Sequence, residues 1–309
     1  MAAEEGMRTL ENPTTIAVIG TGDMGSAVGG ALNRAGLRSV TALANRGVQS
    51  RRLAELSGIE NLGSLRAVAQ NAELILSIVP PAAAVTFADN MAAAMVETGT
   101  RPVFVDCNAV SPATVRSIAR VFESIDVPFV DAGIIGRGPR PNADPPTRIF
   151  VSGAQRRSLL DLKVPELRLI DMGHEIGTAS AIKMAYAALN KGTDALHTAV
   201  LLAAERLGVR AELMKELELS QDEAVRRMRA RVPYLAAVAE RFAGEMAEIA
   251  ATYEAAGVTP LFHRGAGWVF TELATTSLAS ETRATLPAHR SLDVALAVFS
   301  AVLDRGQRS

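Results

Sequence analysis

The chain of 309 residues contains a single cysteine, Cys107, which excludes a disulfide within the chain and fits a reducing compartment. It has only four histidines, His174, His197, His263 and His289. None of them has the close spacing typical of zinc ligands, so we expect no metal site. Charges nearly cancel, with a net charge of −1. No basic or acidic tail indicates nucleic acid or an anionic membrane surface as a partner.

Long hydrophobic runs are also missing. The longest apolar stretches, such as LILSIV at 74–79, are too short to cross a bilayer. The N-terminal stretch MAAEEGMRTLENPTT is acidic and lacks the apolar segment of a secretory signal. We therefore expect a soluble, cytoplasmic protein with no membrane contact. Hydrophobic residues make up 49% of the chain and charged residues 21%, which is enough for a large core in one or two domains.

Short β-rich segments alternate with helical patterns between residues 15 and 171. These segments are TIAVIG, SVTALAN, LILSIV, PVFVDCN, PFVDAGII, RIFVSG and LRLID. Several are apolar on both faces, which is typical of strands buried in a parallel sheet. The alternation predicts an α/β fold, a doubly wound, mostly parallel sheet of the Rossmann type that is covered by helices on both faces.

After LIDMGHEIGTAS the pattern changes, and residues 178 to about 302 offer helical segments only. We therefore expect a flexible N-terminus at 1–14, a Rossmann-type α/β domain at 15–175, and an all-helical domain at 176–309. The one long loop expected is GRGPRPNADPPT at 136–147, because its prolines exclude an element interior. A loop of this length in a compact domain is more often functional than idle.

The segment IAVIGTGDMGSAVGGAL indicates a strand, a tight turn and a helix that starts near Met24. Gly20, Gly22 and Gly25 have the spacing G-x-G-x-x-G. The first glycine permits the turn, the second lets the backbone approach a pyrophosphate, and the third allows close helix–strand packing. The phosphates would lie at the helix N-terminus, where free N–H groups and the macrodipole favour anions. The motif predicts a dinucleotide site; the alternative is a glycine-rich turn without a ligand.

The second strand ends in ALANRGVQSRRLAEL, without the carboxylate that would bind the ribose 2′-hydroxyl of NAD. Asn45 and Arg46 stand there instead, followed by Arg51 and Arg52, and a guanidinium suits a 2′-phosphate. We therefore predict NADP(H) rather than NAD(H), with Asn45, Arg46 and Arg51 in the cofactor site. The alternative is that the arginines lie on the solvated start of a helix.

Further motifs are IVPP at 78–81, VDCNAVSP at 105–112, VDAGIIG at 130–136 and GTASAIK at 177–183. With these, and with GTGDMG at 20–25 and NR at 45–46, the chain resembles the β-hydroxyacid dehydrogenase superfamily. That group includes 6-phosphogluconate dehydrogenase-like enzymes and the related imine reductases. The C-terminal half resembles the DUF1932-type helical domain. The resemblance covers most of the chain and implies a dinucleotide-binding Rossmann domain at 15–175, followed by an all-helical domain for substrate binding and dimerisation at 176–309.

The resemblance also implies roles for single residues. Lys183 falls at the position of the family's catalytic lysine, six residues after Gly177. The implied cofactor-binding residues are Gly20, Gly22, Asp23, Met24 and Gly25 at the pyrophosphate, Val79 and Pro80 beside the adenosine ribose and the nicotinamide, and Asn108 near the nicotinamide ribose.

Two departures from the family pattern concern the substrate. Ile135 stands where the family's D-A-P-V-S-G-G motif has the serine that helps to hold a substrate carboxylate. Tyr186 and Ala187 stand where the family usually has asparagines. A simple 3-hydroxy acid is therefore not favoured, and an apolar or phosphorylated carbonyl compound fits no worse. The substrate-binding residues expected are Gly133, Ile134, Ile135, Tyr186 and Asn190.

Lys183 stands in a mostly apolar helical segment, TASAIKMAYAALNKG at 178–192. At about 100° per residue, Tyr186, Asn190, Asp194 and His197 share one stripe of the helix with it. A buried polar stripe must meet polar partners, in a cleft or in another subunit. We expect Lys183 in chemistry, Tyr186 and Asn190 in substrate positioning, and Asp194 and His197 in packing or an interface. The alternative is a solvated helix face.

These residues predict an enzyme, an NADP-dependent oxidoreductase that transfers hydride between nicotinamide and a small hydroxyl or carbonyl substrate, with Lys183 as general acid or base. Desolvation lowers the pKa of a lysine toward neutrality, as this role requires. The resemblance implies that imine reductases usually lack such a lysine, which favours alcohol and carbonyl chemistry over C=N reduction. Two alternatives stay open, an imine reductase and an NADP(H)-binding sensor without turnover.

The segment ALHTAVLLAAERLGV at 195–209 is apolar on nearly every side, so another surface must cover it. In the superfamily that the chain resembles, this helix often packs against a partner subunit, and we predict a homodimer. The basic segment AVRRMRARVPYL at 224–235 is either a solvated helix face or a contact for an anionic substrate group. The segment PLFHRGAGWVF at 260–270 is either core or a wall of the substrate pocket.

Overall fold

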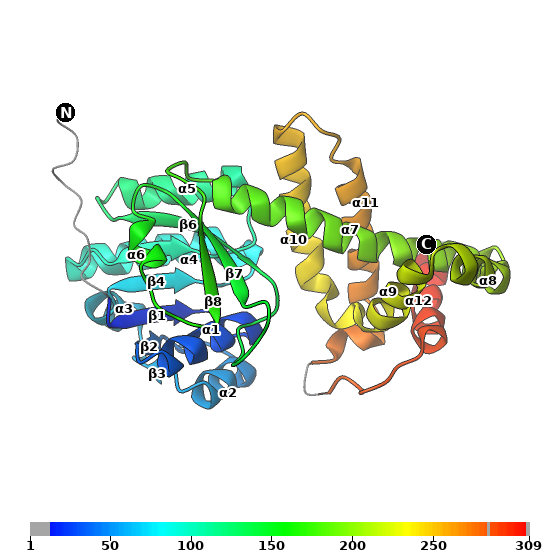
Figure 1. Ribbon diagram of the computed structural model, residues 1–309, viewed down its shortest axis with the longest axis horizontal. Helices are drawn as coiled ribbons and strands as arrows, with labels where there is room; N and C mark the ends of the chain where they lie inside the picture. Colours follow the sequence, from blue (N-terminus) through cyan, green and yellow to red (C-terminus); the bar gives the residue numbers. More distant parts are fainter. Residues whose placement is uncertain (1–12, 283–284, 307–309) are drawn as a thin grey trace. The chain divides into compact units, whose positions relative to one another are not determined.

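The computed structural model describes residues 13–282 and 285–306 (Figure 1). Residues 1–12 of the flexible N-terminus expected at 1–14 lie outside the described residues. The chain divides into two compact units, Met1–Met184 and Ala185–Ser309. The division falls within helix α7 (Thr178–Arg206). The first two turns of this helix therefore belong to the first unit and the rest belongs to the second.

The first unit is built on one sheet of eight strands in the order β3-β2-β1-β4-β5-β6-β7-β8. All neighbouring strands are parallel except β6 and β7, which are antiparallel. The predicted doubly wound, mostly parallel sheet is confirmed. The seven predicted segments form β1 (Thr15–Ile19), β2 (Arg38–Thr41), β4 (Leu74–Ser77), β5 (Val103–Asp106), β6 (Phe129–Ile135), β7 (Thr147–Ser152) and β8 (Leu167–Asp171). The eighth strand, β3 (Glu60–Asn61), has two residues and was not predicted.

Helices cover both faces of this sheet, because the strands are apolar on both. Ile16 and Val18 of β1 belong to one core cluster and Ala17 and Ile19 to another, as the alternation of side chains in a strand requires. The helices are α1 (Asp23–Arg34), α2 (Val48–Leu56), α3 (Leu65–Asn71), α4 (Pro81–Thr98), α5 (Pro112–Glu123) and α6 (Arg157–Leu160). Residues of α3, α4 and α5 belong to the cluster that contains Ala17 and Ile19. Residues of α1 and α6 belong to the cluster that contains Ile16 and Val18.

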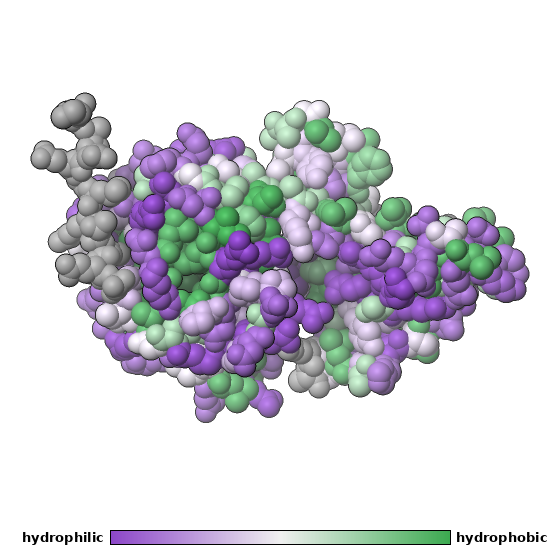
Figure 2. Space-filling model, viewed as in Figure 1, coloured by the Kyte–Doolittle hydropathy of each residue, from purple (hydrophilic) through white to green (hydrophobic). Residues whose placement is uncertain are grey.

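The last strands of the sheet are less completely covered. Leu167, Leu169 and Ile170 of β8 are only half-buried, and hydrophobic surface is visible over this end of the sheet (Figure 2). The long loop expected at 136–147 is irregular up to residue 146, and Thr147 begins β7. This loop crosses the start of α1, because a Cβ atom built on Gly138 would lie 2.9 Å from the Cβ atom of Ala27.

The described residues of the second unit form helices only, which confirms the all-helical prediction. After α7 come α8 (Arg210–Ser220), α9 (Asp222–Arg231), η1 (Val232–Tyr234), η2 (Ala236–Val238), α10 (Ala239–Ala255), α11 (Leu261–Ala274), η3 (Ser277–Ser280) and α12 (Leu292–Gly306). Helices α10 and α11 lie side by side (Figure 1), and Phe242 and Phe270 meet edge to face at 5.3 Å between their ring centroids. Across both units, no helix in the described part combines the length and the apolar character that crossing a membrane needs.

Candidate functional site

The glycine-rich turn joins β1 to α1. Gly20 has a φ of +98°, and a Cβ atom there would lie 2.2 Å from the carbonyl oxygen of Ile78. A Cβ atom on Gly25 would lie 2.1 Å from the carbonyl oxygen of Gly20. Side chains are therefore excluded at both positions. Gly22, the N-cap of α1, is exposed, and a Cβ atom there would meet nothing within 4 Å. The turn thus leaves open space in front of the first N–H groups of α1, which fits a pyrophosphate.

The strand order changes direction beside this turn, since β1 pairs with β2 on one side and with β4 on the other. Such switch points, at the carboxyl ends of the strands, are where open α/β sheets bind ligands. The buried side chain of Asn108 joins two of these strand ends. Its Oδ1 atom accepts the N–H of Val79 at 2.8 Å, and its Nδ2 atom donates to the carboxylate of Asp106 at 2.9 Å. Asn108 therefore helps to hold the segment after β4, which contains Val79 and Pro80.

The end of β2 lies next to the glycine turn. The hydroxyl of Thr21 donates to the carbonyl oxygen of Ser50 at 2.9 Å, which ties the turn to the start of α2. Asn45 has a left-handed backbone with a φ of 59°, and Arg46 after it is exposed. The Nε atom of Arg51 donates to the carbonyl oxygen of Arg46 at 3.0 Å. The predicted 2′-phosphate residues therefore lie together, close to the turn.

Lys183 lies in the second turn of α7, and its side chain is half-buried. Its Nζ atom donates a hydrogen bond to the carbonyl oxygen of Ile134 in β6. The helix and the strand approach closely at this point, because a Cβ atom on Gly133 would lie 2.6 Å from the carbonyl oxygen of Ala179 and 3.0 Å from the Cβ atom of Lys183. The side chains of Ile134 and Ile135 are buried, and both residues pair with β7.

A buried carboxylate that the sequence analysis did not single out holds the start of α7. The Oδ2 atom of Asp131, in β6, accepts the N–H of Gly177 at 2.8 Å, the N–H of Ser180 at 3.1 Å and the hydroxyl of Ser152 at 3.0 Å. Its Oδ1 atom accepts the hydroxyl of Ser180 at 2.7 Å. Burial raises the pKa of Asp131, against these hydrogen bonds. The available signal was a carboxylate inside the otherwise apolar strand segment PFVDAGII.

A second buried carboxylate, Asp106, pairs in register with Asp131 on the neighbouring strand. Burial raises the pKa of Asp106 to about 7, with a smaller contribution from the charge of Asp131, while its hydrogen bonds from Asn108 oppose the shift. Burial also raises the pKa of the adjacent thiol of Cys107. The carboxyl end of β5 and the neighbouring Asp131 of β6 therefore form a desolvated polar cluster.

The remaining polar residues of the predicted stripe belong to the second unit. Tyr186 is exposed, and the Nδ2 atom of Asn190 donates to the carbonyl oxygen of Tyr186 at 3.1 Å. Asp194 is buried and accepts from Arg227 and from Arg231, each at 2.9 Å. Asp194 therefore serves packing within the chain, and these two arginines of the basic segment 224–235 are paired there.

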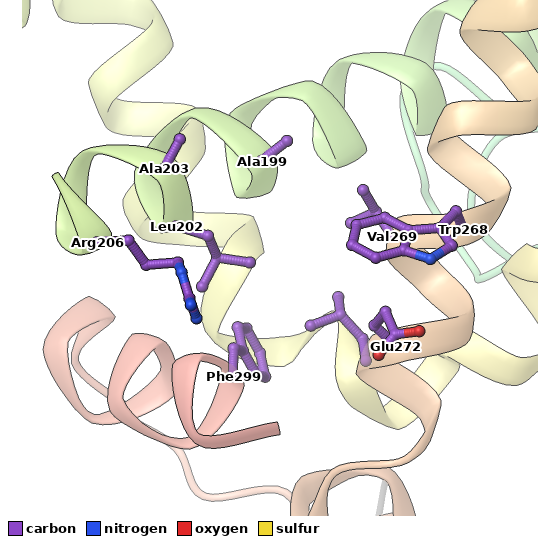
Figure 3. Close-up of a pocket in the computed structure, with 9 residues that line it drawn as sticks. Ala199, Leu202, Ala203, Arg206, Trp268, Val269, Glu272 and Phe299 are labelled. Carbon is purple, nitrogen blue, oxygen red and sulfur yellow. The ribbon is translucent and has the colours of Figure 1, made fainter. Parts of the chain in front are cut away.

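A separate apolar cavity of about 220 Å³ lies within the second unit (Figure 3). Helices α7, α11 and α12 supply its lining, which consists of Ala199, Leu202, Ala203, Arg206, Trp268, Val269, Glu272, Leu273 and Phe299. The segment 260–270 thus lines a cavity through Trp268 and Val269. None of the glycine-turn residues, nor Lys183, is part of its lining.

Metal-binding clusters were not expected. In the part of the chain that the structure describes, no group of three or more His, Cys, Asp or Glu side chains could hold a metal ion.

Comparison with known protein families identifies both halves of the chain. Residues 15–163 match the NAD binding domain of 6-phosphogluconate dehydrogenase, and residues 204–273 match DUF1932, a domain of unknown function. The first unit therefore contains a domain similar to the NAD binding domain of 6-phosphogluconate dehydrogenase. Both matches confirm the resemblance that the sequence motifs indicated, including the helical domain.

Solved structures show the same fold. A conserved protein of unknown function, described as structurally similar to 3-hydroxyacid dehydrogenases, is 27% identical and covers 84% of this chain and 96% of its own, with a TM-score of 0.60. A conserved hypothetical protein from Sinorhizobium meliloti 1021 is 26% identical over 94% of this chain and 96% of its own, with a TM-score of 0.57. The 3-hydroxyisobutyrate dehydrogenase of Mycobacterium tuberculosis, solved with L-serine, is 19% identical over 96% of this chain and 99% of its own, with a TM-score of 0.60. This last likeness shows the fold.

Among curated proteins, an uncharacterised 28.5 kDa protein of Methanothermus fervidus is 26% identical over 178 residues, which is 58% of this chain. The chain spans 66% of the length of that relative.

Proposed function

We propose that the protein is an NADP-dependent oxidoreductase that transfers hydride between nicotinamide and a small hydroxyl or carbonyl substrate. One observation carries this proposal. The half-buried ammonium group of Lys183 donates a hydrogen bond to the carbonyl oxygen of Ile134, and Ile134 lies within the residues that match an NAD binding domain. A positioned, partly desolvated lysine suits general acid–base catalysis.

The cofactor site is proposed at the switch point of the sheet. Support comes from the excluded side chains at two glycines of the turn and from the open space at the third. When bound, the nicotinamide supplies or accepts the hydride. The residues proposed to bind the dinucleotide are Gly20, Gly22, Asp23, Met24 and Gly25 at the pyrophosphate, Val79, Pro80 and Asn108 on the side of β4 and β5, and Asn45, Arg46 and Arg51 at the adenosine ribose.

The preference for NADP(H) rests on the charge at the end of β2. Arg46 is exposed, and within the described residues it forms no ion pair with a carboxylate. Arg51 lies beside it and beside the glycine turn. Guanidinium groups at this place would bind a 2′-phosphate by charge-assisted hydrogen bonds, and the segment 44–52 has no acidic residue to repel it.

Lys183 is proposed to move the proton. In reduction, its ammonium would donate a proton to the substrate oxygen; in oxidation, the neutral amine would accept the proton of the hydroxyl. The hydrogen bond to Ile134 fixes Nζ at the carboxyl end of β6. The main chain of Gly133, Ile134 and Ile135 is proposed to face the substrate there. Tyr186 and Asn190, one and two turns further along α7, are proposed to orient the substrate.

We also propose a homodimer in the cytoplasm. On α7, Leu189 and Leu196 are 71% and 62% exposed. At about 100° per residue they lie about 20° apart around the helix, so the described chain leaves an apolar row on α7 that a second copy would cover. The cytoplasmic setting is supported by the single, buried, unpaired thiol of Cys107.

The proposal is tested by incubating the protein with NADPH and a panel of aldehydes, ketones, keto acids and cyclic imines while the nicotinamide absorbance is followed. We expect carbonyl-dependent oxidation of NADPH. Lys183→Ala should lower it about 10²- to 10⁴-fold, the range for general acid–base groups, and leave the Kd for NADPH unchanged. The exposed Lys163 provides the control variant Lys163→Ala, which should behave as wild type.

Each other outcome is decisive. Wild-type turnover by Lys183→Ala would refute its role in proton transfer. Turnover with imines alone would make the protein an imine reductase. Tight binding of NADPH without turnover across the whole panel would favour a sensor.

A further inference from the structure

The N–H groups at the start of α7 donate hydrogen bonds to a buried carboxylate, that of Asp131, and not to solvent. The first N–H groups of a helix have no partner within the helix. Here the N–H groups of Gly177 and Ser180 donate to Asp131, and the N–H of Ala179 donates to the hydroxyl of Ser152 at 3.1 Å. Ser152 in turn donates to Asp131 at 3.0 Å. Three main-chain donors are therefore satisfied, directly or through one hydroxyl, by a single side chain of β6.

The same strand provides the surface on which this turn packs. Gly133 is two residues after Asp131, so both positions face the same side of the sheet. The missing side chain of Gly133 lets the carbonyl oxygen of Ala179 and the Cβ atom of Lys183 come close to the strand. Ala179 and Lys183 are one helical turn apart and lie on this face of α7.

We propose that Asp131 is a positioning residue that anchors the first turn of α7 on β6 and so fixes the Nζ atom of Lys183 at the carbonyl oxygen of Ile134. Lys183 is only three positions along the helix from Ser180, which Asp131 holds through two hydrogen bonds. Any rotation or shift of the first turn would move the ammonium group by a similar amount. The importance of this position for turnover rests on the proposed function; the anchoring itself does not.

The charge of Asp131 is less important here than its acceptor geometry. An asparagine at 131 can place its amide oxygen where three donors converge, on Oδ2, and direct its amide nitrogen to the hydroxyl oxygen of Ser180, which can rotate to accept. An alanine removes every acceptor and leaves buried main-chain N–H groups without a partner. Asp131→Asn is therefore the conservative variant and Asp131→Ala the disruptive one.

The experiment measures kcat, KM, the Kd for NADPH, and hydrogen–deuterium exchange of residues 177–184 in the full chain. For Asp131→Ala we expect kcat to fall about ten- to hundredfold, since a misplacement of about 1 Å can cost 10²-fold. Exchange of this segment should become at least about tenfold faster, with the Kd for NADPH unchanged. In Asp131→Asn, both kcat and the exchange rate of residues 177–184 should stay close to their wild-type values. Ser64 caps α3 in the same unit, and Ser64→Ala should change neither.

Exchange separates this proposal from the proposed function. Faster exchange in Asp131→Ala together with wild-type turnover by Lys183→Ala would support the anchor and refute the acid–base role. Unchanged exchange and unchanged kcat in Asp131→Ala would overturn the anchor, and so would an Asp131→Asn variant as impaired as the alanine.

A second variant covers the case in which Asp131→Ala does not fold. Gly133→Ala removes no polar group but forces α7 away from β6 through the contact with Ala179. We expect lower kcat with an unchanged Kd for NADPH. Wild-type kcat in Gly133→Ala would show that the position of this turn does not control turnover, and would overturn the proposal.

Discussion

The Oδ1 atom of Asn108 accepts a hydrogen bond from the main-chain N–H of Val79 at 2.8 Å, which joins the segments that follow β5 and β4. The same amide donates to Asp106 and to the hydroxyl of Ser77 at 2.9 and 3.0 Å. All of these groups are buried or nearly so. A single side chain therefore sets the shape of two strand ends at the proposed cofactor site.

Replacing this side chain should destabilise the first unit. In Asn108→Ala the N–H of Val79 is left buried without its acceptor, and Asp106 loses a donor, so we expect the free energy of unfolding to fall by about 1–3 kcal/mol. The Kd for NADPH should rise. Urea unfolding and a binding titration measure both. Asn71→Ala, at an exposed helical position, should stay within about 0.5 kcal/mol of wild type; an equal loss in the two variants would contradict this role of Asn108.

Reversing the charge at the end of β2 should reverse the cofactor preference. Arg46→Asp replaces a group that would bind the 2′-phosphate with one that repels it and can bind a ribose 2′-hydroxyl. We expect the ratio of NADPH affinity to NADH affinity to fall more than tenfold, since hydrogen bonds to charged groups contribute about 1.5–3 kcal/mol each. Isothermal titration with both cofactors measures the ratio. Arg101→Asp, distant in sequence and exposed, is the control, and an unchanged ratio in Arg46→Asp would remove the basis for NADP(H).

Asp106 should make stability depend on pH. Burial raises its pKa to about 7, whereas an unfolded aspartate titrates near pH 3.9. Between these values the folded chain holds the extra proton, so this residue makes the free energy of unfolding fall as pH rises, by up to about 1.4 kcal/mol per pH unit. Its contribution is fully present below about pH 4 and is lost above about pH 7.

Asp106→Asn removes this titration. Urea unfolding at pH 5, 6, 7 and 8 should show the variant gaining stability relative to wild type up to about pH 7 and then levelling off. The absolute stability of the variant also reflects its altered contacts with Asn108, so the slope is the quantity to compare. Asp161→Asn, an exposed carboxylate, should show no such gain. Parallel curves for wild type and Asp106→Asn would contradict the raised pKa.

A buried carboxylate of the second unit, that of Asp194, should contribute more to the free energy of unfolding than an exposed carboxylate does. Asp194 is 1% exposed and binds Arg227 and Arg231, while Asp222 is 62% exposed in its pair with Arg226. We expect Asp194→Ala to lower the free energy of unfolding by about 2–4 kcal/mol, because two charge-assisted hydrogen-bonded pairs are lost from a buried position. Asp222→Ala should cost less than about 1 kcal/mol. Thermal unfolding compares the two directly.

The apolar row on α7 gives a test of the proposed homodimer. Leu196→Glu places a charge in this row of Leu189 and Leu196, where the wild-type side chain is 62% exposed in the single chain. Light scattering at micromolar concentration should give a dimer mass for wild type and a monomer mass for the variant, because burying an unpaired carboxylate is costly. Leu219→Glu, at the 85% exposed Leu219 in α8, is the matched control. A wild-type monomer would refute the dimer, and a variant that stays dimeric would move the interface elsewhere.

Seven strands and the helical character of the C-terminal half followed from apolar runs and periodicity, because those patterns reflect burial along continuous elements. β3 was missed for the same reason. Glu60 and Asn61 are exposed, and two polar residues carry no periodic signal. That β7 runs antiparallel to β6 depends on the path of the loop at 136–146, which composition alone does not determine.

Some features of the candidate site could likewise be predicted from the sequence, and others could not. The glycine turn could be predicted because its spacing reflects a local backbone requirement. The contact between Lys183 and Ile134, and the convergence of Gly177, Ser152 and Ser180 on Asp131, depend on how α7 packs on β6. Those partners lie between 21 and 49 residues apart, and no local pattern encodes such a packing register.

The continuity of α7 has a consequence for how this chain can be recombined. Because one helix of 29 residues supplies both the end of the first unit and the start of the second, a crossover placed at the boundary between the units would cut a helix one residue after Lys183. Chimeras with related chains should therefore be joined outside this helix. A junction after Arg206 keeps Lys183 and Asp131 in the same parent chain. A junction before Gly177 instead pairs Asp131 with the helix start of the other parent, which must then offer the same hydrogen-bond donors. A helical domain from a related chain can therefore replace this one only if the residues that contact each other across the junction are replaced together.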